Sequence, residues 1–542
     1  IRWNASPLRS SFMPIAIDFG TSNTVIARWN AATNQPETVK LPGLAWQMGQ
    51  NPPLIPSLLY LENAATGKVT VGQAVRDLGY DVKNDPRFFR GFKRGIGTKT
   101  SGFMPELDGE TVTFEQVGEW FLSQVVAGIR QVPLPVDSLV LTVPVDSFEA
   151  YRQWLAKVCQ KLEVNQVRML DEPTAAALGY GMTEKELLLV IDFGGGTLDL
   201  SLVRLDMEAQ KKPLGFILKW GEKMFAEKSG QRPQIARVLA KAGKNLGGTD
   251  IDNWLGDYFA TQQGIRKSSL TARLAERVKI QLSMQDKASE VYFDEDNFQS
   301  CDLVLDRGGF EEILAQNRFF EQLDEAMNQV LRQGRMQGVD VGDIDGVLLV
   351  GGTVQIPAVQ RWVRGYFAEE KIRSLMPFEA IARGALQVAQ GIEVKDFLYH
   401  SYGIRYWDRR QQCHNWHPLI KAGQPYPTGK PVELVLGASL ENQPSIEVII
   451  GELGAETGGT EVYFDGDRLI TRSVAAGNTS VQPLNDRAGA RTIAKLNPPG
   501  NPGSDRIKIA FTVDESRRLC ITVEDLFTDA ILVENQPVVE LS

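Results

Sequence analysis

Two segments of the sequence place an aspartate, glycines and small hydroxyl residues where a strand pattern turns back on itself. The first, Pro14 to Arg28, reads PIAIDFGTSNTVIAR, and the second, Leu187 to Val203, reads LLLVIDFGGGTLDLSLV. Each pattern predicts a β-hairpin. Glycine and small residues at such a turn allow backbone N–H groups to approach an anion closely. The chemistry predicted for both turns is phosphate binding.

In the first hairpin, Asp18 stands directly before the turn. A carboxylate beside a bound phosphate can hold hydrated Mg²⁺, which bridges carboxylate and phosphate oxygens. An ordinary tight turn has a similar composition, so this hairpin alone leaves both interpretations open. The residues whose N–H groups would surround the phosphate are Gly20, Thr21, Ser22 and Asn23.

The second hairpin carries the sharper signal, because three glycines follow one another in a strand-turn-strand unit. Successive glycines weaken folding, and close approach of the backbone to a ligand would compensate. Two such loops facing each other would clamp one polyphosphate. The long interval between the hairpins indicates two similar lobes and not a short-period repeat. The residues singled out in this second hairpin are Asp192, Gly194, Gly195, Gly196, Thr197 and Asp199.

Strands and helices alternate around the two hairpins over about 380 residues, which predicts a mixed α/β domain. Hydrophobic spacing indicates the individual elements. Helices are expected at Glu115–Arg130, Phe148–Leu162 and Thr174–Tyr180 and from Pro357, with strands at Leu139–Val143 and Gly346–Gly352. After about residue 392 the helical periodicity disappears, and short alternating runs such as VELVLG (432–437) predict an all-β sandwich.

Three further segments add glycines or acidic residues in a fixed order: LDEPTAAALGYG (170–181), LGGTDID (246–252) and VGG (350–352). Each alone would be an ordinary turn or helix start. Together with the hairpins, they resemble the 70-kDa heat-shock chaperone family (DnaK-like), within the superfamily of actin, sugar kinases and heat-shock ATPases. The resemblance is strong from Ile15 to Gln390 and weaker from 404 to 535. It implies a two-lobed, actin-like α/β ATPase domain followed by an all-β sandwich domain.

The resemblance also implies catalytic roles in ATP hydrolysis. Lys93, in GFKRGIG, matches the family lysine that orients the γ-phosphate and the attacking water. Glu172 matches the carboxylate beside that water and the hydrated magnesium. Asp199 would accept the proton or orient the water, and Thr197 would contact the γ-phosphate. The implied cofactors are ATP or ADP with Mg²⁺, which Asp18 and Asp192 would hold through water, and K⁺ is a further candidate.

Around the nucleoside, the chain both matches the family and departs from it. VGGTVQIP places Gln355 where the family has an arginine that stacks on adenine, and MPFEAIARGAL places Phe378 where the family has an acidic residue. Loss of a guanidinium stack costs about 1 kcal/mol. We therefore expect weaker ATP binding unless Phe378 or a neighbour supplies another surface. The implied nucleoside contacts are Gly248, Glu276, Lys279, Ser283, Gly351, Gly352 and Gln355.

Positions that would couple ATP hydrolysis to peptide binding are partly retained. Pro144 and Arg152 match the family's proline switch and relay arginine, although the usual aromatic residue after the proline is absent. Arg168 and Asp396 match positions that contact J-domain cochaperones. The interdomain linker reads IEVK (392–395) instead of a run of leucines. Because charges weaken docking in an apolar groove, we expect weakened coupling.

The expected organisation has four parts. Residues 1–12 are a leader or tag before Met13, and 13–391 form the nucleotide-binding domain, with an insertion at about 205–245 relative to the family. Residues 392–403 form the linker, and 404–542 form the sandwich. Segments 417–430 and 506–526 resemble the family's peptide-binding sandwich, which would hold extended peptides through main-chain hydrogen bonds. The chain ends at Ser542 without length for a helical lid, so we expect fast peptide release.

Composition limits the alternatives. The 542 residues carry a net charge of −9, which argues against a dedicated nucleic-acid binder, and no run approaches the roughly 18 apolar residues of a membrane helix. The four cysteines are scattered, as expected for a reduced, cytoplasmic protein. Cys413, His414 and His417 share one loop, but without a fourth ligand nearby we predict no metal site there.

The favoured function is an ATP-dependent molecular chaperone that binds unfolded or extended polypeptides. A J-domain cochaperone and a nucleotide-exchange factor are its expected partners, and neither nucleic acid nor membrane is expected. The alternative is an actin-like filament or scaffold protein that uses nucleotide as a switch. A small-molecule kinase is less favoured, because sugar-kinase motifs are missing and a β-rich tail is present.

Overall fold

The structure of the chain is a computed structural model. The predicted leader (1–12), the linker residues 392–395 and Asp396 lie outside the described residues, as does 207–234, most of the predicted insertion. The residues that the structure describes are 14–30, 32–98, 100–102, 104–132, 138–144, 149–162, 164, 166–181, 186–206, 235–294, 298–389, 398, 401–408, 413–420, 426–428, 430–453, 460–465, 468–473, 481–486, 492–514 and 517–541.

The chain divides into two compact units, and each is described by itself. The first unit comprises Ile1–Val394 together with Thr460–Ser473. The second comprises Lys395–Gly459 together with Val474–Ser542. A segment from the C-terminal half therefore belongs to the first unit.

The first predicted hairpin, β1 and β2, lies inside a mixed sheet of the first unit. β1 runs antiparallel to β2 and parallel to β11, and β11 runs parallel to β12. β1 is buried along almost its whole length, as expected for an apolar strand with neighbours on both sides. The strand order is β12 (Gln166–Asp171), β11 (Ser138–Val143), β1 (Pro14–Phe19), β2 (Asn23–Asn30) and β3 (Gln35–Thr38), and β4 (Ile55–Pro56) pairs with β2.

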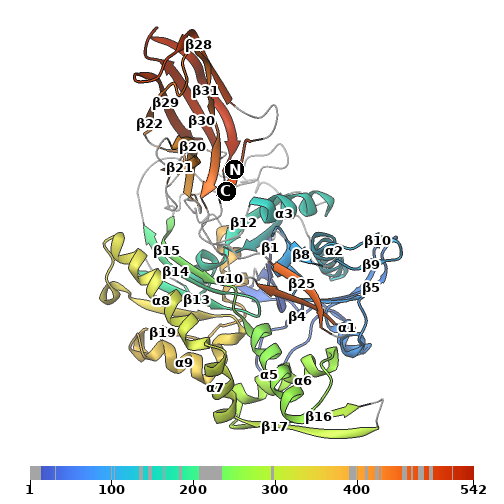
Figure 1. Cartoon of the computed structure of the whole chain (residues 1–542). Helices are drawn as coiled ribbons and strands as arrows, with labels where there is room; N and C mark the ends of the chain where they lie inside the picture. Colours follow the sequence, from blue (N-terminus) through green and yellow to red (C-terminus); the bar gives the residue numbers. More distant parts are fainter. Residues whose placement is uncertain are drawn as a thin grey trace, which may run out of the picture. The chain divides into compact units, whose positions relative to one another are not determined.

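The second predicted hairpin occupies the same place in a second sheet. β13 runs antiparallel to β14 and parallel to β18, as β1 does to β2 and β11. Figure 1 shows β13, β14 and β15 side by side, with α8 (Phe319–Met336) against them. The strand order is β15 (Ile235–Lys244), β14 (Leu198–Asp206), β13 (Leu187–Phe193), β18 (Gly346–Val350) and β19 (Ile372–Arg373).

Two short helices rich in alanine pack between the two sheets. α4 (Glu172–Gly179) and α10 (Ala380–Ala389) share a core with β1, β11, β13 and β18. Their backbones lie so close that a Cβ added at Gly179 would overlap the carbonyl oxygen of Ala380. Asp171 caps α4 by accepting a hydrogen bond from the Thr174 N–H at 2.9 Å, and Pro173 lies in its first turn. The alanines of TAAALGYG are thus explained by close packing of helices.

The remaining elements of the first unit flank these sheets. Thr113 and Gln116 form a capping box at the start of α2, whose apolar face packs into the core beside β1. The elements are β5 (Leu58–Asn63), β6 (Lys68–Val71), α1 (Gln73–Asp77), η1 (Tyr80–Val82), β7 (Phe88–Arg90), η2 (Phe92–Gly95), β8 (Thr100–Gly102), β9 (Glu106–Leu107), β10 (Glu110–Thr111), α2 (Phe114–Gln131), α3 (Glu149–Lys161), α5 (Gly248–Gln263), α6 (Ser269–Met284), β16 (Lys287–Asp294), β17 (Gln299–Asp306), α7 (Arg307–Gln316), η3 (Val341–Asp343), η4 (Gly352–Gln355), α9 (Pro357–Arg364) and η5 (Glu369–Lys371).

The described part of the second unit contains strands joined by turns, and no helix. Side chains from its two four-stranded sheets share one hydrophobic core, which includes Tyr402, Ile450 and Phe511. One sheet has the order β21 (Cys413–Ile420), β20 (Ser401–Asp408), β24 (Ile450–Leu453) and β27 (Val481–Pro483). The other has the order β22 (Val432–Gly437), β29 (Asp505–Val513), β30 (Arg518–Asp525) and β31 (Ala530–Glu540), and β23 (Gln443–Val448) pairs with β28 (Thr492–Gly500).

A hairpin interrupts the second unit in sequence. β25 (Thr460–Asp465) and β26 (Arg468–Ser473) pair with each other, and β25 pairs in parallel with β8 of the first unit. The alternating run EVYFDG was expected to be a strand of the sandwich. It forms a strand, and that strand belongs to the first unit.

Candidate functional site

The two glycine-containing turns face each other at the centre of the first unit. A Cβ added at Gly196 would lie 2.5 Å from Oγ1 of Thr21, and one added at Gly195 would overlap Oγ of Ser22. Any side chain at either glycine would therefore push the two turns apart. The predicted arrangement of paired loops is present, and the absence of a Cβ at these two positions permits it.

The second turn is held from behind by two other predicted segments. The Gly248 and Thr249 N–H groups, at the start of α5, donate to the carbonyl oxygens of Gly194 and Gly195 at 3.1 and 2.9 Å. Oγ1 of Thr353, in η4, donates to the same Gly194 oxygen at 2.8 Å. The segments LGGTDID and VGGTVQIP thus position the second loop.

Lys93 and Glu172 form an ion pair beside these loops. The ammonium Nζ lies 3.0 Å from Oε1 of Glu172, and the two side chains are only 9% and 10% exposed. Lys93 belongs to η2, which Phe92 anchors by packing its ring against Phe19 and Phe121. Glu172 is the first residue of α4. The structure therefore brings together two residues that the sequence places 79 positions apart.

Asp18 and Asp192 add two more carboxyl groups to this cluster. Each lies near the end of its strand, and Thr142 Oγ1 donates to Asp18 Oδ1 at 2.8 Å. Burial and the nearby Glu172 carboxylate raise the pKa of Asp18 to about 7, against the opposing effect of Lys93. Burial and the neighbouring carboxylates, Glu172 first, raise the pKa of Asp192 well above its ordinary value. Carboxyl groups thus outnumber the Lys93 ammonium in this buried cluster, and the raised pKa values of Asp18 and Asp192 favour their protonated forms.

Two further predicted residues lie on the same hairpin. Asp199 is the cross-strand partner of Asp192 in the β13–β14 ladder. Thr197 closes the turn, because its carbonyl oxygen accepts a hydrogen bond from the Gly194 N–H at 3.1 Å. Both residues therefore stand at the second turn, and their contacts with a terminal phosphate stay a prediction.

A carboxylate cluster of this kind fits Mg²⁺, whose preferred ligands are oxygens and which usually retains several waters. Within the described ranges, no three His, Cys, Asp or Glu side chains are grouped so that they could hold a metal directly. The residues present fit an ion held through its waters.

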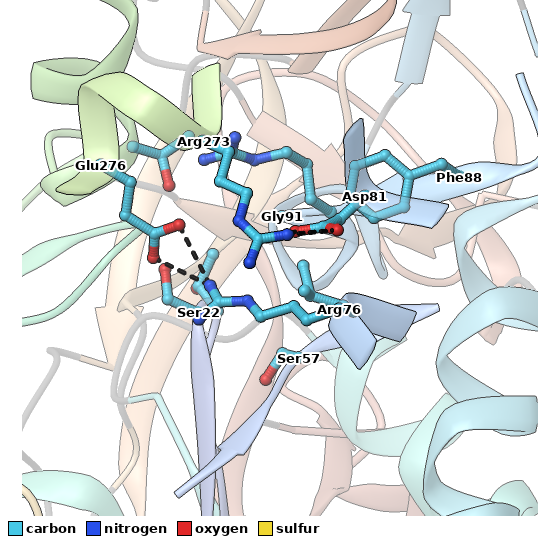
Figure 2. Close-up of a pocket in the computed structure, with 12 residues that line it drawn as sticks. Ser22, Ser57, Arg76, Asp81, Phe88, Gly91, Arg273 and Glu276 are labelled. Atoms are coloured by element: carbon cyan, nitrogen blue, oxygen red, sulfur yellow. Dashed lines mark hydrogen bonds and ion pairs between the residues drawn. The ribbon is translucent and has the colours of Figure 1, made fainter. Parts of the chain in front are cut away.

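A pocket opens beside the first loop. Its walls include Thr21 from that loop. Figure 2 shows two others, Ser22 from the same loop and Glu276 from α6. Glu276 accepts hydrogen bonds from Nη2 of Arg76 at 3.2 and 3.1 Å. Burial would raise the pKa of Glu276, but Arg76, Arg90 and Lys279 outweigh it and lower that pKa. Of the residues predicted to contact a nucleoside, Glu276 is the one that lines this pocket.

The other predicted nucleoside residues lie around α6 and η4. Lys279 Nζ lies 2.6 Å from Asp252 Oδ1 and donates to the Gly248 carbonyl oxygen at 2.9 Å. The Ser283 hydroxyl donates to the Lys279 carbonyl oxygen at 3.0 Å. Lys279 and Ser283 therefore have partners within the protein. Gly351, Gly352 and Gln355 belong to the turn and helix that follow β18.

Phe378 lies against the predicted nucleoside segment. A Cβ added at Gly352 would be 3.2 Å from the Phe378 ring. An aromatic surface is thus present beside Gly352, next to the segment where Gln355 replaces the family's arginine.

Sequence reasoning missed several arginines. Arg94 is buried, pairs with Asp250 at 2.5 Å and donates to the Gly196 carbonyl oxygen. It thereby connects η2, which carries Lys93, to the second loop and the start of α5. Arg90 pairs with Asp252 at 3.4 Å. The basic run RFFRGFKRG contains both arginines, and only its lysine was singled out.

The predicted coupling residues are described only in part. Pro144 directly follows β11 and is half-buried. Arg168 lies on β12, where burial lowers the pKa of its guanidinium. The backbone of Arg152 belongs to α3, but its side chain and all of Asp396 lie outside the described residues.

Comparison with protein families supports this interpretation of the chain. A family model described as "Hsp70 protein" matches residues 65–209 and 235–408. The matched segments contain Lys93, Glu172 and the whole second loop. Among the described residues, no helix combines the length and apolar character needed to cross a membrane.

Proposed function

This chain belongs to the Hsp70 family, and from that premise we propose that it is an ATP-dependent chaperone that hydrolyses ATP in its first unit and binds extended polypeptide segments in its second. The observation that carries the proposal is the buried Lys93–Glu172 pair at the meeting point of two glycine turns. Phosphoryl transfer needs positioned positive charge and an aligned water more than covalent chemistry.

In this proposal the two turns bind the phosphates through backbone N–H groups. Lys93 stabilises charge on the terminal phosphate, and Glu172 orients the attacking water. Thr197 contacts the same phosphate, and Asp199 accepts a proton or orients the water. Mg²⁺, when bound through its waters beside Asp18 and Asp192, would neutralise phosphate charge. The pocket next to Ser22 would accept part of the nucleoside.

The second unit would bind peptides. Its two sheets share a core, as in a sandwich, and strand edges bind extended segments through main-chain hydrogen bonds. Unfolded or extended polypeptides are the proposed clients, and a J-domain cochaperone and a nucleotide-exchange factor are the proposed partners, in the cytoplasm.

The catalytic part is tested by measuring Mg²⁺-dependent phosphate release from ATP. Lys93→Ala and Glu172→Ala should each lower turnover by about two orders of magnitude or more, because each removes a group aimed at the transition state. Lys161→Ala, which breaks an exposed ion pair with Glu119, is the control and should retain activity. Normal turnover in both site variants would refute the catalytic assignment.

The coupling part is tested by fluorescence anisotropy of a labelled extended peptide with ATP, with ADP and without nucleotide. A chaperone whose units communicate should bind the peptide more weakly with ATP. Unchanged affinity would refute the coupling and leave the ATPase assignment intact.

A further inference from the structure

Tyr151 is a buried tyrosine whose hydroxyl has no assigned role in the function proposed above. It lies near the start of α3 and is 4% exposed. Its ring belongs to the same core cluster as Phe19 and Phe92, the neighbours in sequence of Asp18 and Lys93. Its hydroxyl oxygen is buried and has no hydrogen-bond partner among the described residues.

The surroundings of Tyr151 fix its position. A Cβ added at Gly97 would lie 2.6 Å from the Tyr151 backbone nitrogen, so α3 approaches this glycine closely. The Tyr151 ring lies 5.4 Å from that of Trp154, whose indole N–H donates to the Glu115 carbonyl oxygen at 2.9 Å. The carboxylate of Glu115 accepts a hydrogen bond from the Gly97 N–H at 3.0 Å. The phenol is thus held by packing on several sides.

The charged residues of the proposed phosphate site also affect the pKa of this hydroxyl. Burial raises the pKa of Tyr151 to about 12, and the charges of Lys93, Glu172 and Asp18 all act on it. The phenol therefore keeps its proton at neutral pH and remains a hydrogen-bond donor. A buried donor without an acceptor is costly, so such groups call for a specific explanation.

We propose that the Tyr151 hydroxyl donates a hydrogen bond to an oxygen of the terminal phosphate of bound ATP. This inference rests on the proposed ATPase function. The observation that carries it is the fixed, buried and unpartnered hydroxyl, whose ring lies in the same core cluster as Phe19 and Phe92. The missing acceptor is supplied by the nucleotide, and because ADP lacks the γ-phosphate, the contact distinguishes ATP from ADP.

The test measures binding of the β,γ-imido analogue of ATP and of ADP to the full chain by isothermal titration calorimetry. Tyr151→Phe should weaken binding of the analogue about tenfold, the usual size of a hydrogen bond to a charged group. Binding of ADP should stay within about twofold. The melting temperature of the nucleotide-free protein should not fall, because the lost hydroxyl has no partner in the described structure.

Tyr180→Phe is the matched control. The Tyr180 hydroxyl accepts from the Met376 N–H at 3.0 Å and donates to the Leu349 carbonyl oxygen at 3.1 Å. Its loss should therefore lower the melting temperature without changing the ratio of the two nucleotide affinities.

Three results would overturn the inference. The first is unchanged analogue binding in Tyr151→Phe, and the second is equal weakening of analogue and ADP. The third is a lower melting temperature of Tyr151→Phe without nucleotide, comparable with that of Tyr180→Phe. A wild-type protein that binds neither nucleotide would overturn the proposed function and this inference with it.

Discussion

Replacing Lys93 by methionine should destabilise the first unit in a pH-dependent way. Methionine keeps most of the side-chain volume and removes the one ammonium paired with Glu172 at 3.0 Å. Removing one partner of a buried ion pair costs about 3–5 kcal/mol. We expect Lys93→Met to lower the free energy of unfolding by that amount at pH 8.

The pH dependence follows from the carboxyl groups that remain. Lys93 holds down the pKa values of Asp18 and Asp192, so its loss raises both further. A raised pKa in the folded state means that stability is fully present below the unfolded pKa near 4 and is lost as pH rises through the folded value. The deficit of the variant should therefore be about 1–2 kcal/mol smaller at pH 5.5 than at pH 8.

The assay is urea unfolding of wild type and variant at both pH values, with hydrogen exchange of peptides from β1 and β12 identifying the transition of the first unit. Lys161→Met is the control, because its 63% exposed side chain pairs with Glu119. An exposed pair contributes about 1 kcal/mol or less. The reasoning is refuted if Lys93→Met costs no more than Lys161→Met, or costs the same at pH 5.5 and pH 8.

Three other substitutions probe separate features. In the wild type, Mg²⁺–ATP affinity should rise roughly five- to tenfold between pH 6 and pH 8, because the Asp18 pKa lies at about 7 and the ionised carboxylate favours the cation. Asp18→Asn should abolish this rise. A fluorescent-nucleotide titration that shows the same rise in the variant would contradict the prediction. Gly195→Ala should destabilise the nucleotide-free protein by about 1–3 kcal/mol in thermal unfolding. Gly194→Ala should not, because its added Cβ meets nothing within 4 Å. Equal melting temperatures of the two variants would disprove that the two loops face each other. Arg506→Met should destabilise the second unit by about 3–5 kcal/mol in urea, because it leaves the buried Asp525 carboxylate unpaired, and a loss below about 1 kcal/mol would count against this.

Local patterns predicted most of the elements around the site. The helices expected at 115–130, 148–162 and 174–180 correspond to α2, α3 and α4 within two residues at most boundaries, because apolar spacing and capping residues act over one or two turns. The pairing of the two glycine turns was also predictable, since a run of glycines inside a hairpin requires something to lie close to it.

The ion pairs of the site were not predictable in the same way. Arg94 and Asp250, or Arg76 and Glu276, are separated by 156 and 200 residues, and nothing in the local sequence identifies their partners. That the Tyr151 hydroxyl has no hydrogen-bond partner among the described residues can likewise be recognised only from the folded structure. Alternation along 461–466 predicted a strand, but it carries no information about which sheet that strand joins.

The β25–β26 hairpin has a consequence for how this chain can be divided. β25 adds to β8, β26 contacts η2, and η2 carries Lys93. Because the hairpin is inserted between strands β24 and β27 of the second unit, the polypeptide passes from one unit to the other three times. Cleavage in the predicted linker at 392–395 would therefore leave the halves joined through the hairpin. A fragment that stops at 394 would lack the neighbour strand of β8, so the first unit is a discontinuous domain whose last strands begin 66 positions after Val394.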